Sequence, residues 1–575
     1  MTRSPGAAAW GFAWRLAAAG GHRRLVGLLL LAVVQALLPL AGLIALQRLI
    51  DAVARGVAGH QADAAALADA TVAVVAAAAV ACLGSVLRSL ATVVSENHGR
   101  ELSDAAARRL QAHAASVPQS AFDQPAFHDL LLRAGAEAGQ RPVRLVQDGI
   151  AMVVAGVGLL TMVVVLAGVS WWLPGLVAAA ALPLAWIRRR HADQRLRWQE
   201  AHVGDQRDVG YAGAVLTGRS ASKDVRVHGS HGFWLARLDA VRARLRHSLA
   251  GLARRRARDE LLVQTLASAG LFVAYYVLAV DALAGALTLG GLVLQAQAAQ
   301  RAQNGVRDVL AALAGVREHR LFLRPVADFL ALPLAGGNSP NTAPPPGPFA
   351  LACDGVSFVY AEARQPALVD VRFALRAGER VAVTGANGSG KSTLVKLLCG
   401  LYAPTTGSLR VGAVELAGVA PSAWRDRVAA LLQDAQVFEL SVRDNLRFGL
   451  ELADAALWQA LAVVGLDERV RALPDGLGTM CSRRHPGGVE WSAGEARRLL
   501  LARALVRPAD LVLLDEPFDG VDPATAARLA TALRAHRPDA ILVVVDHRPE
   551  ALQVADRVLT LAEGRLVADC SGQRG

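Results

Sequence analysis

The chain has 575 residues, 53% of them hydrophobic, and its mean hydropathy of +0.33 is above that of a typical soluble protein. Its formal net charge of +12 is unevenly placed: residues 1–330 hold 35 Lys and Arg against 22 Asp and Glu, and residues 331–575 hold 26 against 27. A basic excess lying between apolar segments is typical of the cytoplasmic loops of membrane proteins, so we expect no nucleic-acid partner.

Six segments of the first half are long and apolar enough to form membrane helices. A helix needs about 20 mostly apolar residues to cross the hydrocarbon core, where no backbone polar group can stay unpaired. The segments run over 25–47, 67–90, 146–169, 171–187, 261–280 and 285–305. The sequence therefore predicts an all-α membrane domain of six helices over residues 1–330, in contact with membrane lipid.

The connections between these segments differ in length and charge. Two of them, 91–145 and 188–260, are long and polar, and the second begins with the run Arg188–Arg190. Because basic residues concentrate in cytoplasmic loops, we expect both long connections on the cytoplasmic side of the cell membrane. Both termini are then expected on the same side.

A Pro/Gly-rich stretch, 331–349, follows the last apolar segment. Proline fixes the backbone and removes hydrogen-bond donors, so this stretch is predicted to be a linker. Beyond it, β-branched runs such as 380–384, 511–514 and 541–545 alternate with helical patterns, which indicates an α/β domain over residues 350–575. The five cysteines are scattered without paired or metal-ligand spacing, so no disulfide framework is expected.

A glycine-rich segment comes directly after the first of these runs and opens a helical pattern. It consists of Gly385, Ala386, Asn387, Gly388, Ser389, Gly390, Lys391, Ser392 and Thr393. This spacing and context are those of a phosphate-binding loop, whose backbone N–H groups wrap around phosphate oxygens. Lys391 would place its charge on the β and γ oxygens, and Ser392 would ligate Mg²⁺. We therefore expect ATP and Mg²⁺ as cofactors, the alternative being an ordinary glycine turn before a helix.

A pair of carboxylates, Asp515 and Glu516, ends the apolar run 511–514. Nucleotide hydrolysis needs one carboxylate to hold the metal and another to position and deprotonate the attacking water. We assign the metal to Asp515 and the water to Glu516. Taken alone, an apolar run followed by Asp-Glu is equally consistent with an ordinary strand end. Downstream of a phosphate-binding loop, it indicates a catalytic pair.

Together these motifs resemble the ATP-binding cassette family, and the resemblance to its exporter-type half-transporters extends over nearly the whole chain. It implies that Gln433 is the Q-loop glutamine, which senses the metal and the membrane domain. It also implies that His547 holds the γ-phosphate, that Tyr360 stacks on adenine and that Asp522 is the D-loop aspartate. In this family ATP lies between two cassettes, so a chain with one cassette is expected to work as a dimer.

The signature motif of the family, which acts on the partner's ATP, has the consensus LSGGQ. Its counterpart here is Trp491, Ser492, Ala493, Gly494 and Glu495, so three of the five positions differ. A helix N-terminus with a serine and a glycine still offers N–H donors to a γ-phosphate. The resemblance leaves open whether the partner is an identical or a different half-transporter chain.

The function implied by the resemblance is ATP-driven export of a peptide, lipid or drug-like substrate. Segments 120–129 and 216–226 would be the coupling helices that press on the cassettes, although solvated connecting loops have similar composition. A soluble cassette ATPase would have no use for six apolar segments. Two alternatives stay open: an importer built on the exporter fold, which a comparison of uptake with efflux would reveal, and a cassette that gates a channel, in which ATP turnover would not accompany flux.

Overall fold

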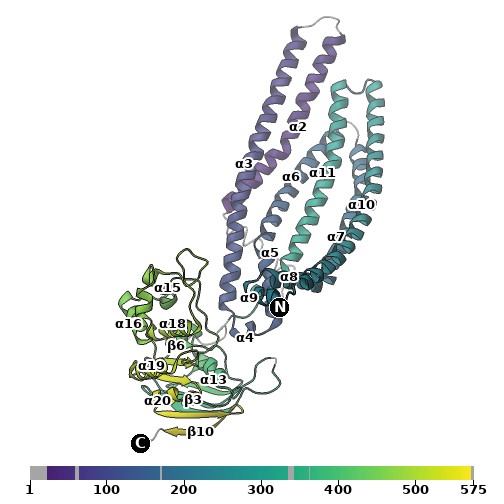
Figure 1. Cartoon of the computed structure of the whole chain (residues 1–575). Coiled ribbons are helices and arrows are strands. Elements are labelled where there is room, and N and C mark those ends of the chain that lie inside the picture. Colours follow the sequence, from purple (N-terminus) through teal and green to yellow (C-terminus); the bar gives the residue numbers. More distant parts are fainter. Residues whose placement is uncertain (1–21, 59–63, 169–170, 335–341, 362, 572–575) are drawn as a thin grey trace. The chain divides into compact units, whose positions relative to one another are not determined.

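The computed structural model describes residues 22–58, 64–168, 171–334, 342–361 and 363–571 (Figure 1). Their contacts divide the chain into two units, one made of residues 1–112 and 130–331 and the other of residues 113–129 and 332–575. The segment 113–129, which the sequence prediction placed in the membrane domain, therefore packs with the second unit. One reason is a hydrogen bond of 2.6 Å from the Tyr402 hydroxyl to the Asp123 carboxylate. The two termini, predicted to be cytoplasmic, fall outside the described residues.

The first unit is built from long helices, and its described residues contain no strand. Its helices are α2 (His22–Ala58), α3 (Ala64–Ser116), α5 (Pro125–Ala138), α6 (Arg141–Ala167), α7 (Leu173–Ala201), α8 (Val203–Thr217), α9 (Arg219–Val227), α10 (His231–Leu283), α11 (Leu289–Phe322) and α12 (Arg324–Leu330). The last turn of α3 and the first turn of α5 belong to the second unit, together with the short α4 (Gln119–Phe122) between them. The predicted coupling segment 216–226 corresponds mainly to α9.

Each of the six predicted membrane segments overlaps one of these helices. Among the described residues, four helices are long and apolar enough to cross a membrane, namely α2, α3, α6 and α10. The segments 171–187 and 285–305 belong to α7 and α11, which fall short of the same criterion. Charged and amide side chains lower their hydropathy, since the arginine run 188–190 enters α7, and Gln295, Gln297 and Arg301 interrupt α11.

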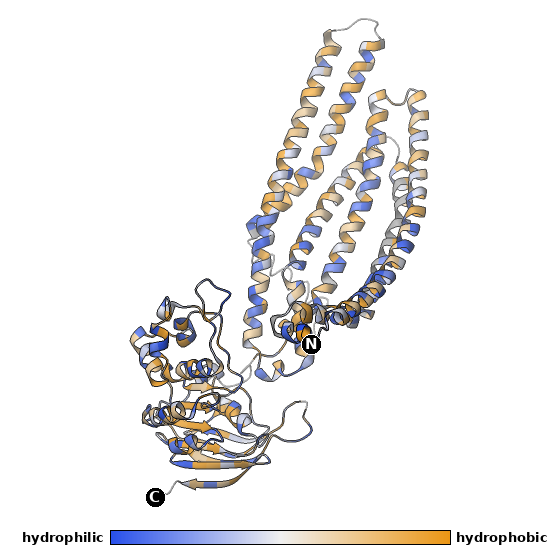
Figure 2. Ribbon diagram, viewed as in Figure 1, coloured by the Kyte–Doolittle hydropathy of each residue, from blue (hydrophilic) through white to orange (hydrophobic). Residues whose placement is uncertain are grey.

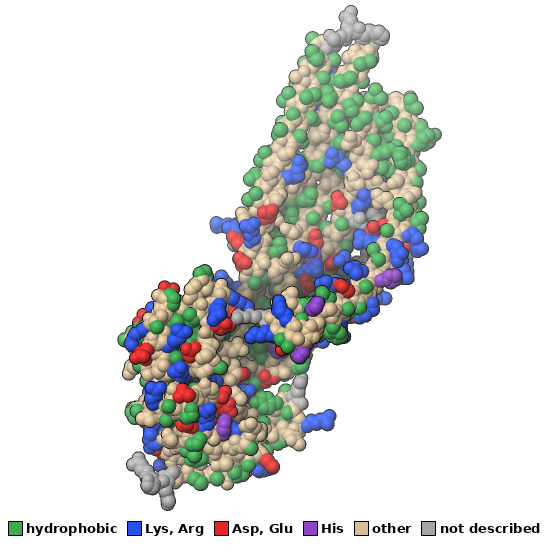
Figure 3. Space-filling model, viewed as in Figure 1, with side chains coloured by type: hydrophobic (Ala, Val, Ile, Leu, Met, Phe, Trp, Pro, Cys, Tyr) green, Lys and Arg blue, Asp and Glu red, His purple; other side chains and the backbone are tan. Residues whose placement is uncertain are grey.

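The surface of the first unit changes character along the helices. Hydrophobic residues cover the upper parts of the long helices in the view of Figure 2, and hydrophilic residues are more frequent toward their lower ends. Charged side chains are correspondingly sparse on the upper part of this unit in Figure 3. Large apolar side chains of the long helices are exposed, including Val75, Leu160 and Phe272, which are 63%, 64% and 68% exposed. Such a continuous apolar surface suits contact with lipid.

A carboxylate from α2 fixes the start of α11. The side chain of Asp51 accepts hydrogen bonds from the Gly290 N–H at 2.8 Å and from the Thr288 hydroxyl at 3.1 Å. The first N–H groups of a helix have no partner within the helix, and an anion there also interacts favourably with the helix dipole. Asp51 therefore satisfies a helix end and joins two membrane helices at the same time.

The second unit contains two β-sheets. The smaller has the antiparallel order β2-β1-β4-β5, and the larger has the order β10-β9-β3-β8-β7-β6, in which only the β10–β9 pair is antiparallel. The strands are β1 (Leu351–Phe358), β2 (Leu368–Leu375), β3 (Arg380–Thr384), β4 (Thr406–Val411), β5 (Val414–Glu415), β6 (Val428–Leu431), β7 (Leu511–Asp515), β8 (Ile541–Val545), β9 (Arg557–Ala562) and β10 (Arg565–Ser571). The predicted runs 380–384 and 541–545 are β3 and β8, and the run 511–514 continues by one residue in β7. The fold class predicted from the sequence, helical membrane region plus α/β cassette, is confirmed.

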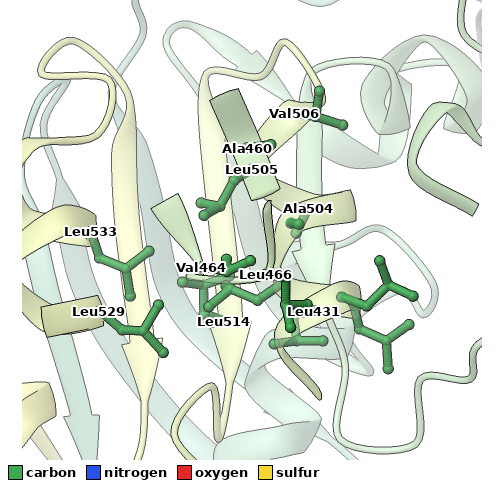
Figure 4. Close-up of a cluster of buried hydrophobic side chains, with 14 of the residues drawn as sticks. Leu431, Ala460, Val464, Leu466, Ala504, Leu505, Val506, Leu514, Leu529 and Leu533 are labelled. Carbon is green, nitrogen blue, oxygen red and sulfur yellow. The ribbon is translucent and has the colours of Figure 1, made fainter. Parts of the chain in front are cut away.

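Helices complete the second unit and cover its larger sheet. They are α13 (Lys391–Leu398), α14 (Pro421–Arg425), α15 (Val442–Arg447), α16 (Asp454–Val463), α17 (Asp467–Arg471), α18 (Ala493–Val506), α19 (Pro523–Ala535) and α20 (Pro549–Val554), with the 3₁₀ turns η1 (Leu416–Gly418) and η2 (Gly476–Gly478). Apolar side chains of α16, α18 and α19 pack with strand residues such as Leu431 and Leu514 in one buried cluster (Figure 4). Every residue of β7 is buried, as expected of a central parallel strand.

The predicted linker 331–349 is only partly described. Residues 335–341 lie outside the described residues. Thr342, however, forms an isolated parallel bridge with Val419, so the end of this stretch pairs with the second unit. This bridge lies outside the two sheets, and it forms because proline removes donors only at its own positions and Thr342 keeps its N–H and C=O.

Candidate functional site

The predicted phosphate-binding residues form a tight turn between β3 and α13. Gly385, Gly388 and Gly390 have φ angles of +146°, +80° and +101°, a region that favours glycine. A Cβ at Gly385 would also lie 2.2 Å from the carbonyl oxygen of Leu561. The glycines therefore allow the backbone to curl tightly against β9. The curl directs the chain into the N-terminus of α13, where free N–H groups and the helix dipole favour an anion.

Two buried polar side chains in this turn fit a phosphate ligand. Lys391 is 8% exposed, and its Nζ donates hydrogen bonds to the carbonyl oxygens of Gly385 and Ala386 at 2.8 and 2.9 Å. The hydroxyl of Ser389 is buried and has no hydrogen-bond partner among the described residues. A buried hydroxyl without a partner is unfavourable, and phosphate oxygens would accept from it. The exposed Asn387 completes the turn.

A small cavity beside the turn collects the predicted Mg²⁺ ligands. It measures about 180 Å³ and is lined by Ser392, Lys396, Leu432, Gln433, Asp434 and Asp515. Asp515 is 2% exposed, and burial raises the pKa of its carboxyl while a hydrogen bond from the Ser392 side chain opposes that rise. Mg²⁺ prefers oxygen ligands and is commonly held by one or two carboxylates together with phosphates. The oxygens of Ser392, Gln433 and Asp515 therefore fit this ion.

Glu516 stands next to this cavity in an uncommon backbone conformation. Its φ is +52°, and its N–H donates to the carbonyl oxygen of Val545 at 2.7 Å. The left-handed region costs a residue with a Cβ about 1–2 kcal/mol, and such strain is concentrated at functional sites. The Nε2 of Gln433 donates to Oε2 of Glu516 at 3.4 Å. The structure thus brings the predicted Q-loop glutamine next to the predicted catalytic glutamate.

Tyr360 lies beside the phosphate-binding turn. Its hydroxyl is 3.2 Å from the hydroxyl of Thr393 in α13, and its ring packs edge-on against Phe358 and Tyr402, with centroids 4.8 and 5.6 Å away. The ring is only half-buried. These contacts fix an aromatic face next to α13, which is where an adenine joined to bound phosphates would need one.

His547 and Asp522 are not among the residues that line this small cavity. His547 follows β8 by two residues, its side chain is 73% exposed, and its Nδ1 lies 3.6 Å from the carboxylate of Asp546. Asp522 is the N-cap of α19, and its carboxylate accepts a hydrogen bond from the Thr525 N–H at 2.9 Å. Within one chain Asp522 therefore has a structural role as a helix cap, which the sequence prediction did not include.

The signature residues form the start of α18, as predicted. Ser492 is the N-cap: its hydroxyl accepts from the Glu495 N–H at 3.2 Å, and the Glu495 carboxylate accepts from the Ser492 N–H at 2.9 Å. Glu495 also pairs with Arg469 at 3.2 Å. The backbone hydrogen bond from Ser492, aided by Arg469, lowers the pKa of Glu495. The carboxylate that replaces the consensus glutamine is thus ionised and already held by two partners.

Gly494 and Ala493 precede Glu495 in the signature motif. A Cβ at Gly494 would lie 2.5 Å from the carbonyl oxygen of Gly520, so the start of α18 lies directly against the loop that follows Glu516. Ala493 is the first residue of the helix. Because a side chain at position 494 would collide with that loop, this position needs glycine, whereas position 493 carries a methyl group.

Sequence reasoning missed Arg497, which lies further along α18. Its guanidinium is bonded to main-chain carbonyl oxygens of both the Gln433 segment and the Glu516 segment. No motif pointed to it, because arginine in a helix is ordinary and its partners are 18 to 65 positions away in the chain.

Comparisons with known proteins found a matching family model, similar sequences and a similar fold. The family model described as ABC transporter matches residues 368–519. The subtilin transport ATP-binding protein SpaT of Bacillus subtilis is 23% identical over 457 residues, which cover 78% of this chain and 73% of SpaT. The fold is that of a solved bacterial Atm1-family ABC exporter with ATP bound, with a TM-score of 0.76, 22% identity, and 96% and 95% of the two chains covered.

Other relatives match at higher identity over a shorter stretch. The mycobactin import ATP-binding/permease protein IrtB of Mycolicibacterium smegmatis is 36% identical over 217 residues, covering 38% of this chain and 37% of IrtB. The β-(1→2)glucan export ATP-binding/permease protein NdvA of Agrobacterium fabrum is 33% identical over 213 residues, covering 37% of this chain and 36% of NdvA. The matches to these two relatives thus span less than half of their length.

Proposed function

We propose that the chain, whose residues 368–519 match the ABC transporter family model and whose fold is that of a solved Atm1-family exporter, is an ATP-hydrolysing half-transporter that exports its substrate from the cytoplasm as a dimer. The observation that carries the proposal is the placement of Asp515, Glu516 and Gln433 beside a complete phosphate-binding turn, in a chain whose described residues also include four strongly apolar helices. A soluble ATPase would not need those helices.

The residues of the site divide the chemistry between them. The turn from Gly385 to Thr393 would hold the phosphates of ATP, and Tyr360 its adenine. Ser392, Gln433 and Asp515 would hold Mg²⁺, which when bound supplies charge neutralisation for the phosphate oxygens. Glu516 would accept the proton of the attacking water, with Gln433 orienting that water. His547 would contact the γ-phosphate.

A dimer is needed because the proposed ATP site takes its residues from two chains. Ser492, Ala493, Gly494 and Glu495, with Asp522, would act on the ATP bound by the partner chain, so each ATP needs both chains. ATP would then bind the closed pair of cassettes more tightly than the open pair. That difference in affinity is the only source of work available to move the membrane helices.

The substrate class we propose is a peptide, a lipid or a drug-like molecule. The names of SpaT and NdvA describe subtilin transport and β-(1→2)glucan export for those proteins. Import is the second candidate, because IrtB, whose name describes mycobactin import, is the relative with 36% identity in the matched part. Uptake of substrate into inverted vesicles on adding ATP supports export. ATP-dependent release from such vesicles supports import.

The variant Glu516→Gln tests the hydrolytic site. An amide can still hydrogen-bond water but cannot accept its proton, so we expect ATP turnover to fall by about 10²–10⁴-fold while ATP binding persists. Phosphate release and nucleotide trapping in reconstituted protein measure the two quantities. Glu451→Gln, which makes the same change at an exposed glutamate outside the site, is the control. Turnover at the parental rate in Glu516→Gln would show that Glu516 is not the base.

A further inference from the structure

Arg497 binds the main chain on both sides of the proposed water site. Its Nε and Nη2 donate to the Glu516 carbonyl oxygen at 3.1 and 3.0 Å, and Nη2 also donates to the carbonyl oxygen of Asp515. Its Nη1 donates to the carbonyl oxygens of Leu432 and Gln433 at 3.1 and 3.4 Å. One side chain therefore joins the end of β7 to the segment that follows β6.

These carbonyl groups lie where the pairing of β6 and β7 ends, and Arg497 adds to the turn hydrogen bonds that Leu432 and Glu516 accept from the N–H groups of Ala435 and Asp519, both at 3.2 Å. Strands β6 and β7 are parallel neighbours, and their pairing ends near Leu431 and Leu514. Backbone carbonyls just past the last ladder bond are unpaired unless another group donates to them. Guanidinium carries five N–H donors in a rigid plane, so it can bind several carbonyls of two segments at once. The spacing between the two strand ends is thereby fixed at the place where Gln433 meets Glu516.

The strained backbone of Glu516 is held at both of its polar groups. Its N–H is bonded to the carbonyl oxygen of Val545, and its carbonyl oxygen accepts from Arg497. A non-glycine residue at φ +52° keeps that conformation only if its surroundings impose it. Loss of the Arg497 contacts would allow the peptide to relax toward negative φ. The Glu516 side chain would then leave its position opposite Gln433.

Arg497 is also a half-buried cation close to four carboxylates. Burial lowers the pKa of its guanidinium, and Asp515, Asp519, Glu516 and Asp546 oppose that shift. The carboxylate of Asp546 is 1% exposed, and its Oδ2 has no hydrogen-bond partner among the described residues. Several acidic groups near one another repel, and the guanidinium of Arg497 places a positive charge close to them.

We propose that Arg497 is a positioning residue for ATP hydrolysis, which holds the main chain of Gln433 and Glu516 so that their side chains stay within hydrogen-bonding distance of each other at the proposed water site. The inference rests on the proposed function and adds to it a residue that does not touch the nucleotide. It predicts a loss confined to the hydrolytic step, since the phosphate-binding turn makes no use of Arg497.

The variants Arg497→Gln and Arg497→Lys test this role, with Arg498→Gln as the matched control. Arg498 lies next to Arg497 in α18 but donates to the carbonyl oxygens of Val464 and Gly465, at 3.3 and 2.9 Å, away from the site. We expect Arg497→Gln to lower kcat on the order of a hundredfold, as misplacing a catalytic group does, and to change the Kd of MgATP by less than about twofold. Arg497→Lys should recover part of kcat, and Arg498→Gln should keep it.

A double-mutant cycle with Glu516→Gln distinguishes positioning of Glu516 from a loss of activity through a general perturbation of the fold. If Arg497 acts through Glu516, Arg497→Gln should not slow the residual single-turnover hydrolysis of Glu516→Gln any further. Losses that multiply, a Kd for MgATP that rises in parallel with the loss of kcat, or an equal loss in Arg498→Gln would each overturn the inference. Should Arg497→Gln fail to fold, Arg497→Lys carries the same cycle. A normal rate in Glu516→Gln alone would instead count against the proposed function.

Discussion

At the scale of single residues, burying the Asp515 carboxylate lowers the stability of the folded cassette while providing a charged ligand for the proposed Mg²⁺ site. Burial raises the pKa of its carboxyl, so the folded cassette binds this proton more tightly than the unfolded chain does. Stability attributable to this group therefore falls as pH rises from the ordinary pKa of the carboxyl through the raised one, and it is recovered on acidification. The ionised, desolvated carboxylate is retained because a Mg²⁺ ligand needs the charge.

The variant Asp515→Asn makes this balance measurable. We expect its unfolding temperature without nucleotide to exceed that of the parent by a few degrees at neutral pH, because the desolvated charge is gone. The difference should shrink as the pH falls through the raised pKa of Asp515, and ATP hydrolysis should be lost at every pH. Asp434→Asn, which removes an exposed carboxylate beside the same cavity, should change the unfolding temperature little. A pH-independent difference for Asp515→Asn would contradict the assigned cause.

The same scale shows why the sequence predicts some site residues and not others. The residues of the phosphate-binding turn, Asp515 and Glu516 belong to contiguous motifs, in which a strand, a turn and a helix are adjacent in the chain. Arg497 acts through carbonyl groups brought near it only by folding. Because every residue has a main-chain carbonyl group, the sequence does not indicate which of them an arginine binds. The left-handed conformation of Glu516 is equally hidden, since glutamate gives no sign of positive φ.

At the scale of elements, the reciprocal hydrogen bonds of Ser492 and Glu495 begin α18. Removing the Glu495 side chain leaves the Ser492 N–H without its acceptor, so Glu495→Ala should lower the free energy of unfolding of the cassette by about 1 kcal/mol. Glu495→Gln keeps an acceptor oxygen and loses only the half-exposed pair with Arg469, so its cost should be under about 0.5 kcal/mol. Denaturant unfolding of both variants checks this. Equal costs would mean that the ion pair, not the cap, stabilises the helix start.

The strands could be predicted from the sequence, whereas the unit to which each segment belongs could not. The parallel strands β3, β7 and β8 are buried on both faces and therefore appear as short apolar runs with clear ends. The segment 113–129 continues a long helical pattern, and its packing with the second unit depends on tertiary contacts such as Tyr402 with Asp123. The helices α7 and α11 were predicted from apolar stretches that polar residues dilute, which is common where membrane helices face one another or a polar path.

At the scale of the whole molecule, the question is whether two copies of this chain make two working ATP sites. In the proposed function, Lys391, Asp515 and Glu516 would act on the ATP of their own chain, whereas the altered signature would act on the partner's. With a different partner chain, only one of the two sites would contain the altered signature. In a homodimer both sites would contain it, so turnover by the chain purified alone reports directly on how much the three changes matter.

We expect the chain alone to hydrolyse ATP, because Ser492 and Gly494 are retained and the charge of Glu495 is already balanced by the Ser492 N–H and by Arg469. A compensated carboxylate repels a nearby phosphate much less than a free one, and solvent screening weakens the repulsion further. Changing Ala493 to Gly and Glu495 to Gln together should therefore raise turnover less than about tenfold, which corresponds to 1.4 kcal/mol. The measurement is ATPase activity of the reconstituted lone chain before and after the double change, with Glu451→Gln as a neutral comparison. Feeble turnover that the double change restores by more than that would mean that the signature limits the site, and would favour a partner chain of different sequence.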